Sequence, residues 1–227
     1  MNKKRTMSVF SWIMGVVFCP LGIAFCTKAD FGLSMIAAPA FIWSSALHEK
    51  YPVLTQGTCE YLWQAALLVL LCIILRRFRF SFLLSFVTAF LSGKFIDVWL
   101  SVLGGNTPYE SMAVRIVSFI IGEIILGCAI AFYFRTTLPL QVYELAVVQI
   151  SEKWSIKKEK VKYANDIIML IISLILSFTL THKLTGIGIG TVIITVVNSP
   201  IILCCGFMID KIFKINNLNF KQKQNGA

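Results

Sequence analysis

Charged residues are scarce in this sequence, at 14% of its 227 residues, whereas a typical soluble domain carries about 25%. Hydrophobic residues account for 57%. A chain of this length folded in water has too little interior to bury so much apolar surface. The composition therefore excludes a soluble enzyme, a disordered chain and a coiled coil. It predicts an all-α polytopic membrane protein.

Motifs for catalysis and metal binding are also missing. The sequence has no nucleophile elbow, phosphate-binding loop, H-E-x-x-H pattern or dinucleotide fingerprint. Its seven cysteines form no C-x-x-C pair, and His48 and His182 show no ligand spacing. We therefore expect no enzymatic activity, no cofactor and no metal site.

Long apolar runs dominate what is present, and six of them are long enough to cross a bilayer. Two shorter apolar stretches, Phe31–His48 and Leu138–Ile150, each contain a proline, and we expect them to be re-entrant or interfacial helices. The first run follows Lys3, Lys4 and Arg5 but is too long for a signal peptide, so we expect an uncleaved span. The six predicted spans are Ser8–Thr27, Thr58–Leu75, Phe80–Leu103, Val114–Phe134, Asn165–Thr181 and Gly186–Ile209.

The net charge of +10 comes from basic residues at the ends of these runs. This position favours the anionic inner leaflet of a membrane over nucleic acid as the partner. With six spans and an inner N-terminus, sixteen Lys and Arg fall inside and only Lys28, Lys50, Arg115 and Lys183 fall outside. The sequence therefore predicts that both termini are cytoplasmic. The inner residues are Lys3, Lys4, Arg5, Arg76, Arg77, Arg79, Arg135, Lys153, Lys157, Lys158, Lys160, Lys162, Lys211, Lys214, Lys221 and Lys223.

The chain also repeats itself weakly. A shift of about 107 residues places Lys28 on Arg135 and one short stretch on the other, and the halves close on GKFID (Gly93–Asp97) and GFMID (Gly206–Asp210). Because each half has three spans, the second half enters the membrane inverted, as in many secondary transporters. The alternative is that the similarity between the halves reflects only the apolar composition that all membrane helices share. The predicted organisation is a first membrane repeat over residues 1–110, an inverted second repeat over 111–215 and a cytoplasmic basic tail over 216–227.

Interrupted short segments at matching positions indicate a binding site in such an architecture. We expect Ser34 to cap the first short helix, and the exposed N–H groups at a helix start suit an anion. Lys28 and Arg135 are alternatively ordinary snorkelling ends of spans, and Asn198 is alternatively part of a simple kink before Pro200. The predicted solute-binding residues are Lys28, Ser34, Arg135, Gln141, Glu144 and Asn198.

Three charged residues inside the spans form a second group. Lys94 and Asp97 lie three residues apart, so they share a helix face and we expect them to pair. Glu123 lies near the middle of its span without a local basic partner and must face the bundle interior or stay protonated. We predict that Glu123, with Lys94 and Asp97, couples a proton or cation. The alternative for Glu123 is a neutral carboxyl that forms a hydrogen bond between helices.

At several of these segments the sequence resembles the YitT/YczE-like family of bacterial integral membrane proteins. The matching pieces are LGIAFCTKADFGLS from Leu21, LTQGT at Leu54–Thr58, FLSGKFIDVWL at Phe90–Leu100 and TGIGIGTVIITVVNSP at Thr185–Pro200. The chain departs from the family pattern at Met35, where proline is common, and at Ser199, where glycine is common. The resemblance implies a bacterial cytoplasmic membrane and this topology, and it leaves the function open.

Two functions follow from these patterns. The first is a secondary transporter or permease of a small polar solute, with an anion favoured, bound between the inverted repeats. The alternative is a non-transporting scaffold or regulator that acts through the basic amphipathic loop Ile150–Tyr163. The expected partners are the lipid bilayer and a small solute, without nucleic acid, and the chain would act alone or as a homodimer.

Overall fold

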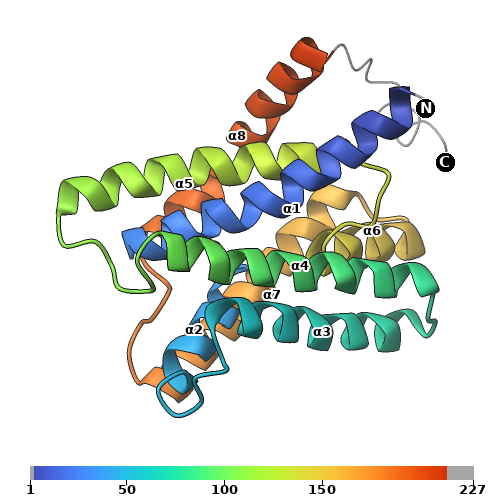
Figure 1. Cartoon of the computed structure of the whole chain (residues 1–227). Helices are drawn as coiled ribbons and strands as arrows, with labels where there is room; N and C mark the ends of the chain where they lie inside the picture. The colour runs from blue at the N-terminus through green and yellow to red at the C-terminus, as the bar shows by residue number, and fades with distance from the viewer. Residues whose placement is uncertain (1–2, 214–227) are drawn as a thin grey trace.

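The structure, a computed structural model, describes residues 3–213, which form helices and no strands (Figure 1). The tail predicted over residues 216–227, with Lys214, Lys221 and Lys223, lies outside these residues. The helices are α1 (Lys3–Ala29), α2 (Ala38–Leu47), α3 (Gln56–Leu75), α4 (Phe80–Val102), α5 (Met112–Tyr133), α6 (Val142–Trp154), α7 (Lys158–Leu176), continued by the π-helical turn η1 (Ser177–Thr181), and α8 (Ile189–Phe213).

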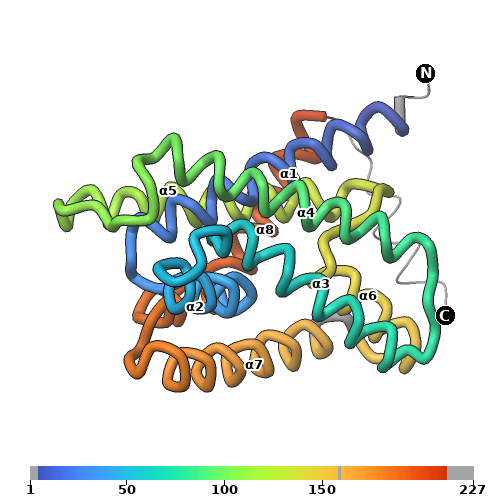
Figure 2. Tube along the Cα trace, turned by 60° about the horizontal axis from the view of Figure 1, so that its bottom comes forward, coloured from blue at the N-terminus to red at the C-terminus, as the bar shows by residue number. Residues whose placement is uncertain are grey.

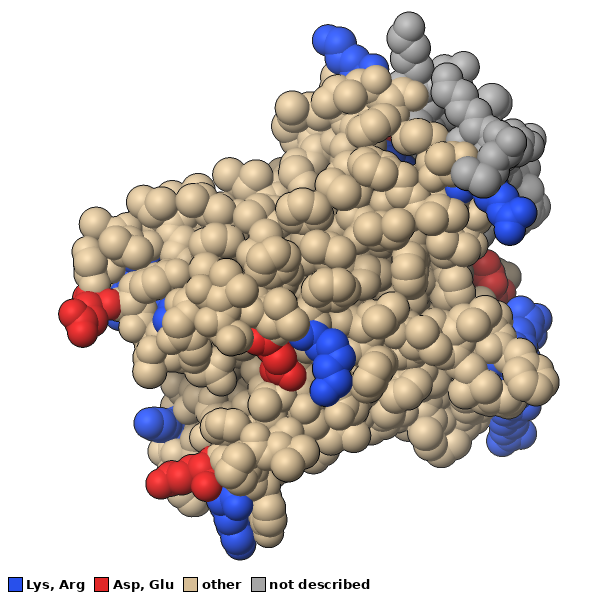
Figure 3. Space-filling model, in the orientation of Figure 1, with Lys and Arg blue, Asp and Glu red and all other residues tan. Residues whose placement is uncertain are grey.

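The six predicted spans are confirmed as helices long and apolar enough to cross a membrane. They comprise α1, α3, α4, α5, α7 with its η1 continuation, and α8. Large apolar side chains such as Val69, Ile120 and Leu203 are exposed on their outer surfaces. Charged side chains lie chiefly toward two sides of the molecule, and the surface between them is mostly uncharged apart from a small acidic and basic group near its centre (Figure 3). The chain is therefore a multi-pass membrane protein.

The spanning helices alternate in direction between two ends of the bundle. The basic end contains the start of α1, the α3–α4 connection, α6 and the end of α8, and the opposite end contains α2 and the α4–α5 and α7–α8 connections. Figure 1 places the start of α1 and the end of α8 on the same side. In Figure 2, α2 and α6 lie near the two ends of α7, and both pack against it.

The centre of the bundle is an antiparallel contact between α1 and α5. Glycines allow the two backbones to approach: a Cβ atom on Gly22 would lie 2.8 Å from the carbonyl oxygen of Gly122. About two helical turns toward the basic end, Gly15 leaves room for the ring of Tyr133, which would lie 2.7 Å from an added Cβ atom. The largest apolar core surrounds this contact, with residues from α1, α2, α4, α5 and α8. The hydrophobic effect does not drive helices together inside a membrane, and small residues here allow the close van der Waals packing that does.

At the opposite end, the loop after α1 crosses the glycine-rich loop before α8. The carbonyl of Phe31 accepts a 2.8 Å hydrogen bond from the N–H of Gly190, and the N–H of Leu33 donates to Gly186 at 2.9 Å. A Cβ atom on Gly188 would lie 2.5 Å from the Phe31 carbonyl oxygen. This backbone contact explains the GIGIG sequence. A shallow pocket of about 290 Å³ lies between the two loops.

This crossing corrects the predicted start of the first short helix. Helix α2 begins at Ala38, because the residues before it run as a loop. Its N-cap is Ala37, without a side-chain hydrogen bond. The Ser34 carbonyl, rather than its hydroxyl, accepts the N–H groups of Ala37 and Ala38. The expected Ser34 side-chain cap is therefore wrong.

Two further expectations about helix boundaries are also corrected. Helix α6 has Gln141 as its N-cap, so the predicted short stretch Leu138–Ile150 becomes helical only at Val142, after its proline. Helix α8 continues through Pro200 without a break, so the stretch around Asn198 is part of a continuous helix.

Candidate functional site

Buried polar side chains from four helices meet inside the bundle at the start of α6. They are all at most 5% exposed, although the surrounding helices are apolar. We call this set the inner polar cluster: Glu60 and Gln64 on α3, Ser92 on α4, Tyr133 on α5, and Gln141 and Tyr143 at α6.

Glu60 is the acidic centre of the inner polar cluster. Its Oε1 atom accepts hydrogen bonds from the Tyr143 hydroxyl and from Nε2 of Gln64, both at 3.1 Å. Within the described residues Oε2 accepts none, and no basic side chain forms an ion pair with Glu60. Two neutral donors therefore hold one oxygen of the carboxyl group, and the other is left for a proton or a ligand.

The same glutamine fixes the start of α6. Oε1 of Gln64, whose side chain is completely buried, accepts the first helical N–H, that of Val142, at 3.1 Å. This bond satisfies one of the N–H groups that a helix start leaves free. Gln64 lies 11 residues from the basic end of α3, or roughly 16 Å at 1.5 Å per residue. Helix α6 thus begins deep in the bundle.

Gln141 forms the other side of the cluster. Its Nε2 atom donates to Oγ of Ser92 at 2.7 Å and to the hydroxyl of Tyr133 at 3.2 Å. The loop before it is also anchored, because the Pro139 carbonyl accepts hydrogen bonds from Nε1 of Trp12 and Oγ1 of Thr88, both at 3.1 Å. Contacts from α1, α3, α4 and α5 therefore position this polar loop.

Glu144 lies beside the cluster on the side of α7. Its Oε2 atom is buried without a hydrogen-bond partner in the described structure. Burial raises the pKa of the Glu144 carboxyl above its ordinary value of 4.5, and the charge of Lys162 partly opposes this shift. Gln141 and Glu144 are thus the two predicted site residues that the fold brings to one place.

Lys28 and Arg135 do not meet. The Lys28 ammonium donates to the Thr107 carbonyl and lies 4.7 Å from the centre of the Tyr109 ring, at the opposite end. At the basic end, Nε and Nη2 of Arg135 each donate to a carboxylate oxygen of Asp210 at 2.6 Å. Because α1 and α5 are antiparallel, their last residues are at opposite ends of the bundle.

Asp97 has a different partner from the one predicted. Its Oδ1 atom accepts the N–H of Gly57 at 2.8 Å, and Oδ2 accepts the Thr55 hydroxyl at 2.7 Å, so it caps the start of α3. The Lys94 ammonium lies 5.7 Å from the centres of the Tyr61 and Phe90 rings. The expected Lys94–Asp97 pair is therefore wrong, since the helix start is a closer source of positive charge for the carboxylate.

Glu123 lies in the α1–α5 contact and is 4% exposed. Its Oε1 atom is 3.5 Å from the sulfur of Cys26, which donates, and its Oε2 atom has no partner in the described chain. The two remaining predicted residues are elsewhere: Ser34 is in the loop before α2, and Asn198 is on α8 with a buried, unpartnered Oδ1 atom.

Sequence reasoning missed Glu60 and Gln64, a carboxyl and an amide side chain of the site that are 3% and 0% exposed. A usable signal was present, because a Glu and a Gln four residues apart share one face of a helix. Inside an apolar span, such a face must point toward protein.

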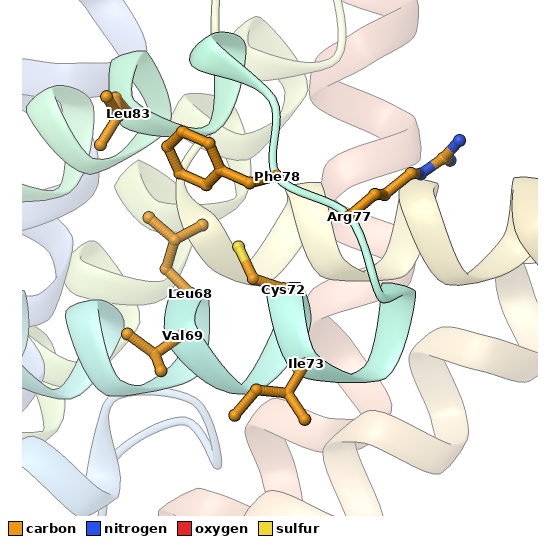
Figure 4. Close-up of a pocket in the computed structure, with 7 residues that line it drawn as sticks. All are labelled: Leu68, Val69, Cys72, Ile73, Arg77, Phe78 and Leu83. Atoms are coloured by element: carbon orange, nitrogen blue, oxygen red, sulfur yellow. The ribbon is translucent and has the colours of Figure 1, made fainter.

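A second hollow lies on the surface at the basic end, between α3 and α4, with a volume of about 500 Å³. Figure 4 shows its apolar lining and the Arg77 side chain directed away from it. Its lining residues are Leu68, Val69, Cys72, Ile73, Arg77, Phe78 and Leu83. Among the side chains that the structure describes, no group of His, Cys, Asp or Glu is placed to hold a metal ion.

Comparison with known proteins gives a family for the chain. The uncharacterized protein YyaS of Bacillus subtilis (strain 168) is 26% identical over 162 residues, which cover 70% of this chain and 77% of that protein. No solved structure matches. Residues 5–206 match the family model DUF6198, described as a family of unknown function. The YitT/YczE-like resemblance stays a prediction, since neither match carries that name. The chain belongs to DUF6198, a family of unknown function.

Proposed function

We propose that this protein is a secondary transporter that binds a small polar solute at the inner polar cluster. The observation that carries the proposal is the burial of Glu60, Gln64, Gln141 and Tyr143 together inside a membrane helix bundle. Polar groups cost free energy in such an interior unless they have partners. Glu144 Oε2 is buried without a partner in the described structure, and both hydrogen bonds of the Glu60 carboxyl group go to Oε1 and leave Oε2 free, as expected where a ligand or proton completes the site.

The packing of the helices supports an inverted repeat around this site. Helix α1 packs on α4 as α5 packs on α8, α2 packs on α3 as α6 packs on α7, and α3 packs on α6 as α7 packs on α2. The two halves meet through the antiparallel α1–α5 pair. Two differences break the symmetry in the described chain. Helix α3 packs on α4, whereas α7 and α8 do not pack on each other, and α4 packs on α6, whereas α8 does not pack on α2. In alternating access, the second half would adopt the helix contacts now found in the first half, and the first half would lose them.

Both short helices direct their positive ends inward, which supports the re-entrant alternative. The first residues of α2, Ala38–Ala40, are at most 1% exposed or fully buried, and so is Val142 of α6. Their last turns lead to exposed residues at opposite ends of the bundle, around Lys50 and Lys153. Helix starts favour negative charge. A solute with a carboxylate, phosphate or other electronegative group fits this arrangement best.

Glu123 is our proposed coupling residue in the outer half. Its neighbour Gly122 packs on Gly22 of α1, whereas the ring of Tyr133 in the cluster packs on Gly15, seven residues earlier. Seven residues correspond to roughly 10 Å along a helix, so Glu123 and the inner polar cluster occupy different depths. We assign Asp97 to capping α3 and place the basic end in the cytoplasm of a bacterium, because basic ends stay inside.

The proposal is tested by the thermal stability of the purified protein in detergent with a panel of small metabolites at two pH values. A ligand at a hundred times its dissociation constant adds about 2.7 kcal/mol. We expect one class of polar solute to raise the melting temperature of the wild type and of Gln56→Met, but not of Gln64→Met. Gln56 is a matched control, since it is a buried glutamine on the same helix that donates to Thr27 outside the cluster. Equal shifts in both variants would contradict the proposed site.

A further inference from the structure

A second set of acidic groups connects the inner polar cluster with the surface at the basic end. On α7, the Lys162 ammonium lies 3.4 Å from Oδ2 of Asp166, and the Lys162 side chain is 39% exposed. The other oxygen of Asp166, Oδ1, is buried without a hydrogen-bond partner in the described structure, as is Oε2 of Glu144 on α6. Helices α6 and α7 pack on each other here.

The charges of these groups influence one another across the contact between α6 and α7. Besides burial, which is the largest cause, the pKa of Glu144 responds to the charges of Lys162 and Asp166. The Glu144 charge also acts on Glu60 and on Tyr143. The titratable and charged groups that face this region are Cys19 from α1, Glu60 from α3, Tyr133 from α5, Tyr143 from α6, and Lys162 and Asp166 from α7.

We propose that Asp166 and Glu144 form a proton path from the basic end to Glu60, which makes the proton the coupling ion of the transporter. This inference rests on the proposed function for its purpose, because a proton path serves a transporter only if a solute moves with the proton. The Lys162 ammonium, which is partly exposed, pairs with Asp166 at the mouth of the path.

The transfer requires Glu144, whose Oε2 atom has no partner in the described structure, to come within hydrogen-bond distance of Asp166 and then of the Tyr143 hydroxyl. With these approaches it balances in three steps. Asp166 takes a proton from water at the surface and passes it to the Glu144 carboxylate, which becomes a neutral acid. Tyr143 already donates its hydroxyl hydrogen bond to Glu60, so it gives that proton to the Glu60 carboxylate as it receives one from Glu144. Asp166, Glu144 and Tyr143 then return to their starting charge. The neutral Glu60 remains, hydrogen-bonded to Gln64 as before.

Infrared spectroscopy of the protein in phospholipid vesicles tests the path without any solute. The carbonyl band of a protonated carboxyl that disappears in Glu60→Gln identifies Glu60. On transfer to D₂O this band shifts as a deuteron replaces the proton. The rate of the shift measures how fast solvent deuterons reach Glu60. We expect Glu144→Gln and Asp166→Asn each to slow the shift severalfold. Glu152→Gln, an exposed residue on the same α6 helix, should leave the rate unchanged.

Equal rates in wild type, Glu144→Gln and Asp166→Asn would overturn the path, and so would the absence of a Glu60 carboxyl band at every pH. Asp166 lies near the surface, so its variant keeps the test available if Glu144→Gln does not fold. The outcome is separable from that of the proposed function. A slowed shift together with a metabolite panel that gives no stabilisation would contradict the transporter and leave the proton path standing.

Discussion

The hydroxyl of Tyr143 donates a 3.1 Å hydrogen bond to Oε1 of Glu60, and this contact joins the start of a short helix to a spanning helix of the other half of the chain. Tyr143 is 4% exposed and Glu60 is 3% exposed. Each group therefore loses its hydrogen bonds to water and forms one to the other, in an interior that offers few alternative partners. The account of the protein as a transporter depends on this contact and its neighbours.

Removing the tyrosine hydroxyl tests how much the contact stabilises the fold. Tyr143→Phe leaves Oε1 of Glu60 with Gln64 as its one donor in the cluster. We expect a loss of about 1 kcal/mol of stability, measured as a lower melting temperature in detergent. Tyr163→Phe is the control, because Tyr163 is 67% exposed. A loss that is equal in both variants would show that the buried bond contributes nothing specific.

The contact between α3 and α4 depends on two facing glycines. A Cβ atom on Gly57 would clash with the carbonyl oxygen of Gly93, which is backbone and cannot rotate away. We expect Gly57→Ala to cost about 1–3 kcal/mol or more through overpacking, and to disturb the Asp97 cap beside it. Ala66→Val adds volume to an exposed face of the same helix and should change the melting temperature little. An unchanged melting temperature for Gly57→Ala would contradict the close packing.

The Arg135–Asp210 pair is expected to be structural. Both side chains are largely buried, with 17% and 12% exposed, so loss of one partner leaves a charge without compensation. We predict that Asp210→Asn costs about 3–5 kcal/mol and that the double variant Arg135→Met, Asp210→Leu costs less. The more exposed Asp30–Arg115 pair at the other end is the comparison, and Asp30→Asn should cost under about 1 kcal/mol. Additive losses in the double variant would argue against a coupled pair.

Glu144 gives a prediction about pH. Burial raises its folded-state pKa above the ordinary value of 4.5, so the folded protein resists losing this proton more than the unfolded chain does. Below 4.5 both states hold the proton and no penalty exists; as pH rises through the folded pKa, stability is lost. We therefore expect the wild type to lose melting temperature relative to Glu144→Gln as pH rises from about 4 to neutrality. Glu152→Gln should run parallel to the wild type, and a constant wild-type difference from Glu144→Gln would contradict the shift.

Coupling gives a prediction that is independent of folding. Glu123→Gln keeps the shape of the side chain and can still accept from Cys26, but it cannot gain or lose a proton. We predict that solute uptake by this variant no longer responds to a pH gradient while its melting temperature is retained. Normal pH dependence in Glu123→Gln would remove Glu123 from the coupling mechanism.

The spans could be predicted from the sequence because bilayer thickness sets the length of an apolar run. Phe80–Leu103 was predicted and α4 covers Phe80–Val102. The start of α2 could not, because it depends on a backbone contact between Phe31 and Gly190, which are far apart in the chain. Local sequence carries no record of which loop packs against which.

The candidate site shows the same division. Gln141 and Glu144 were predicted because an interrupted apolar stretch is visible in the sequence. Lys28 and Arg135 align in the sequence, but antiparallel packing of α1 and α5 puts them at opposite ends of helices that are roughly 30 Å long or more. Glu60 and Gln64 share a face of α3 that the sequence does show, but the groups that this face meets on α6 are decided by packing.

The most direct test of the account is solute uptake into liposomes that contain the purified protein, using the metabolite that raises its melting temperature most. We predict accumulation in wild-type liposomes that grows with an imposed pH gradient, is lost in Gln64→Met and is kept in Gln56→Met. If the metabolite binds but enters wild-type liposomes no faster than protein-free liposomes, with or without the gradient, the protein is not a transporter of that solute and the central claim is contradicted.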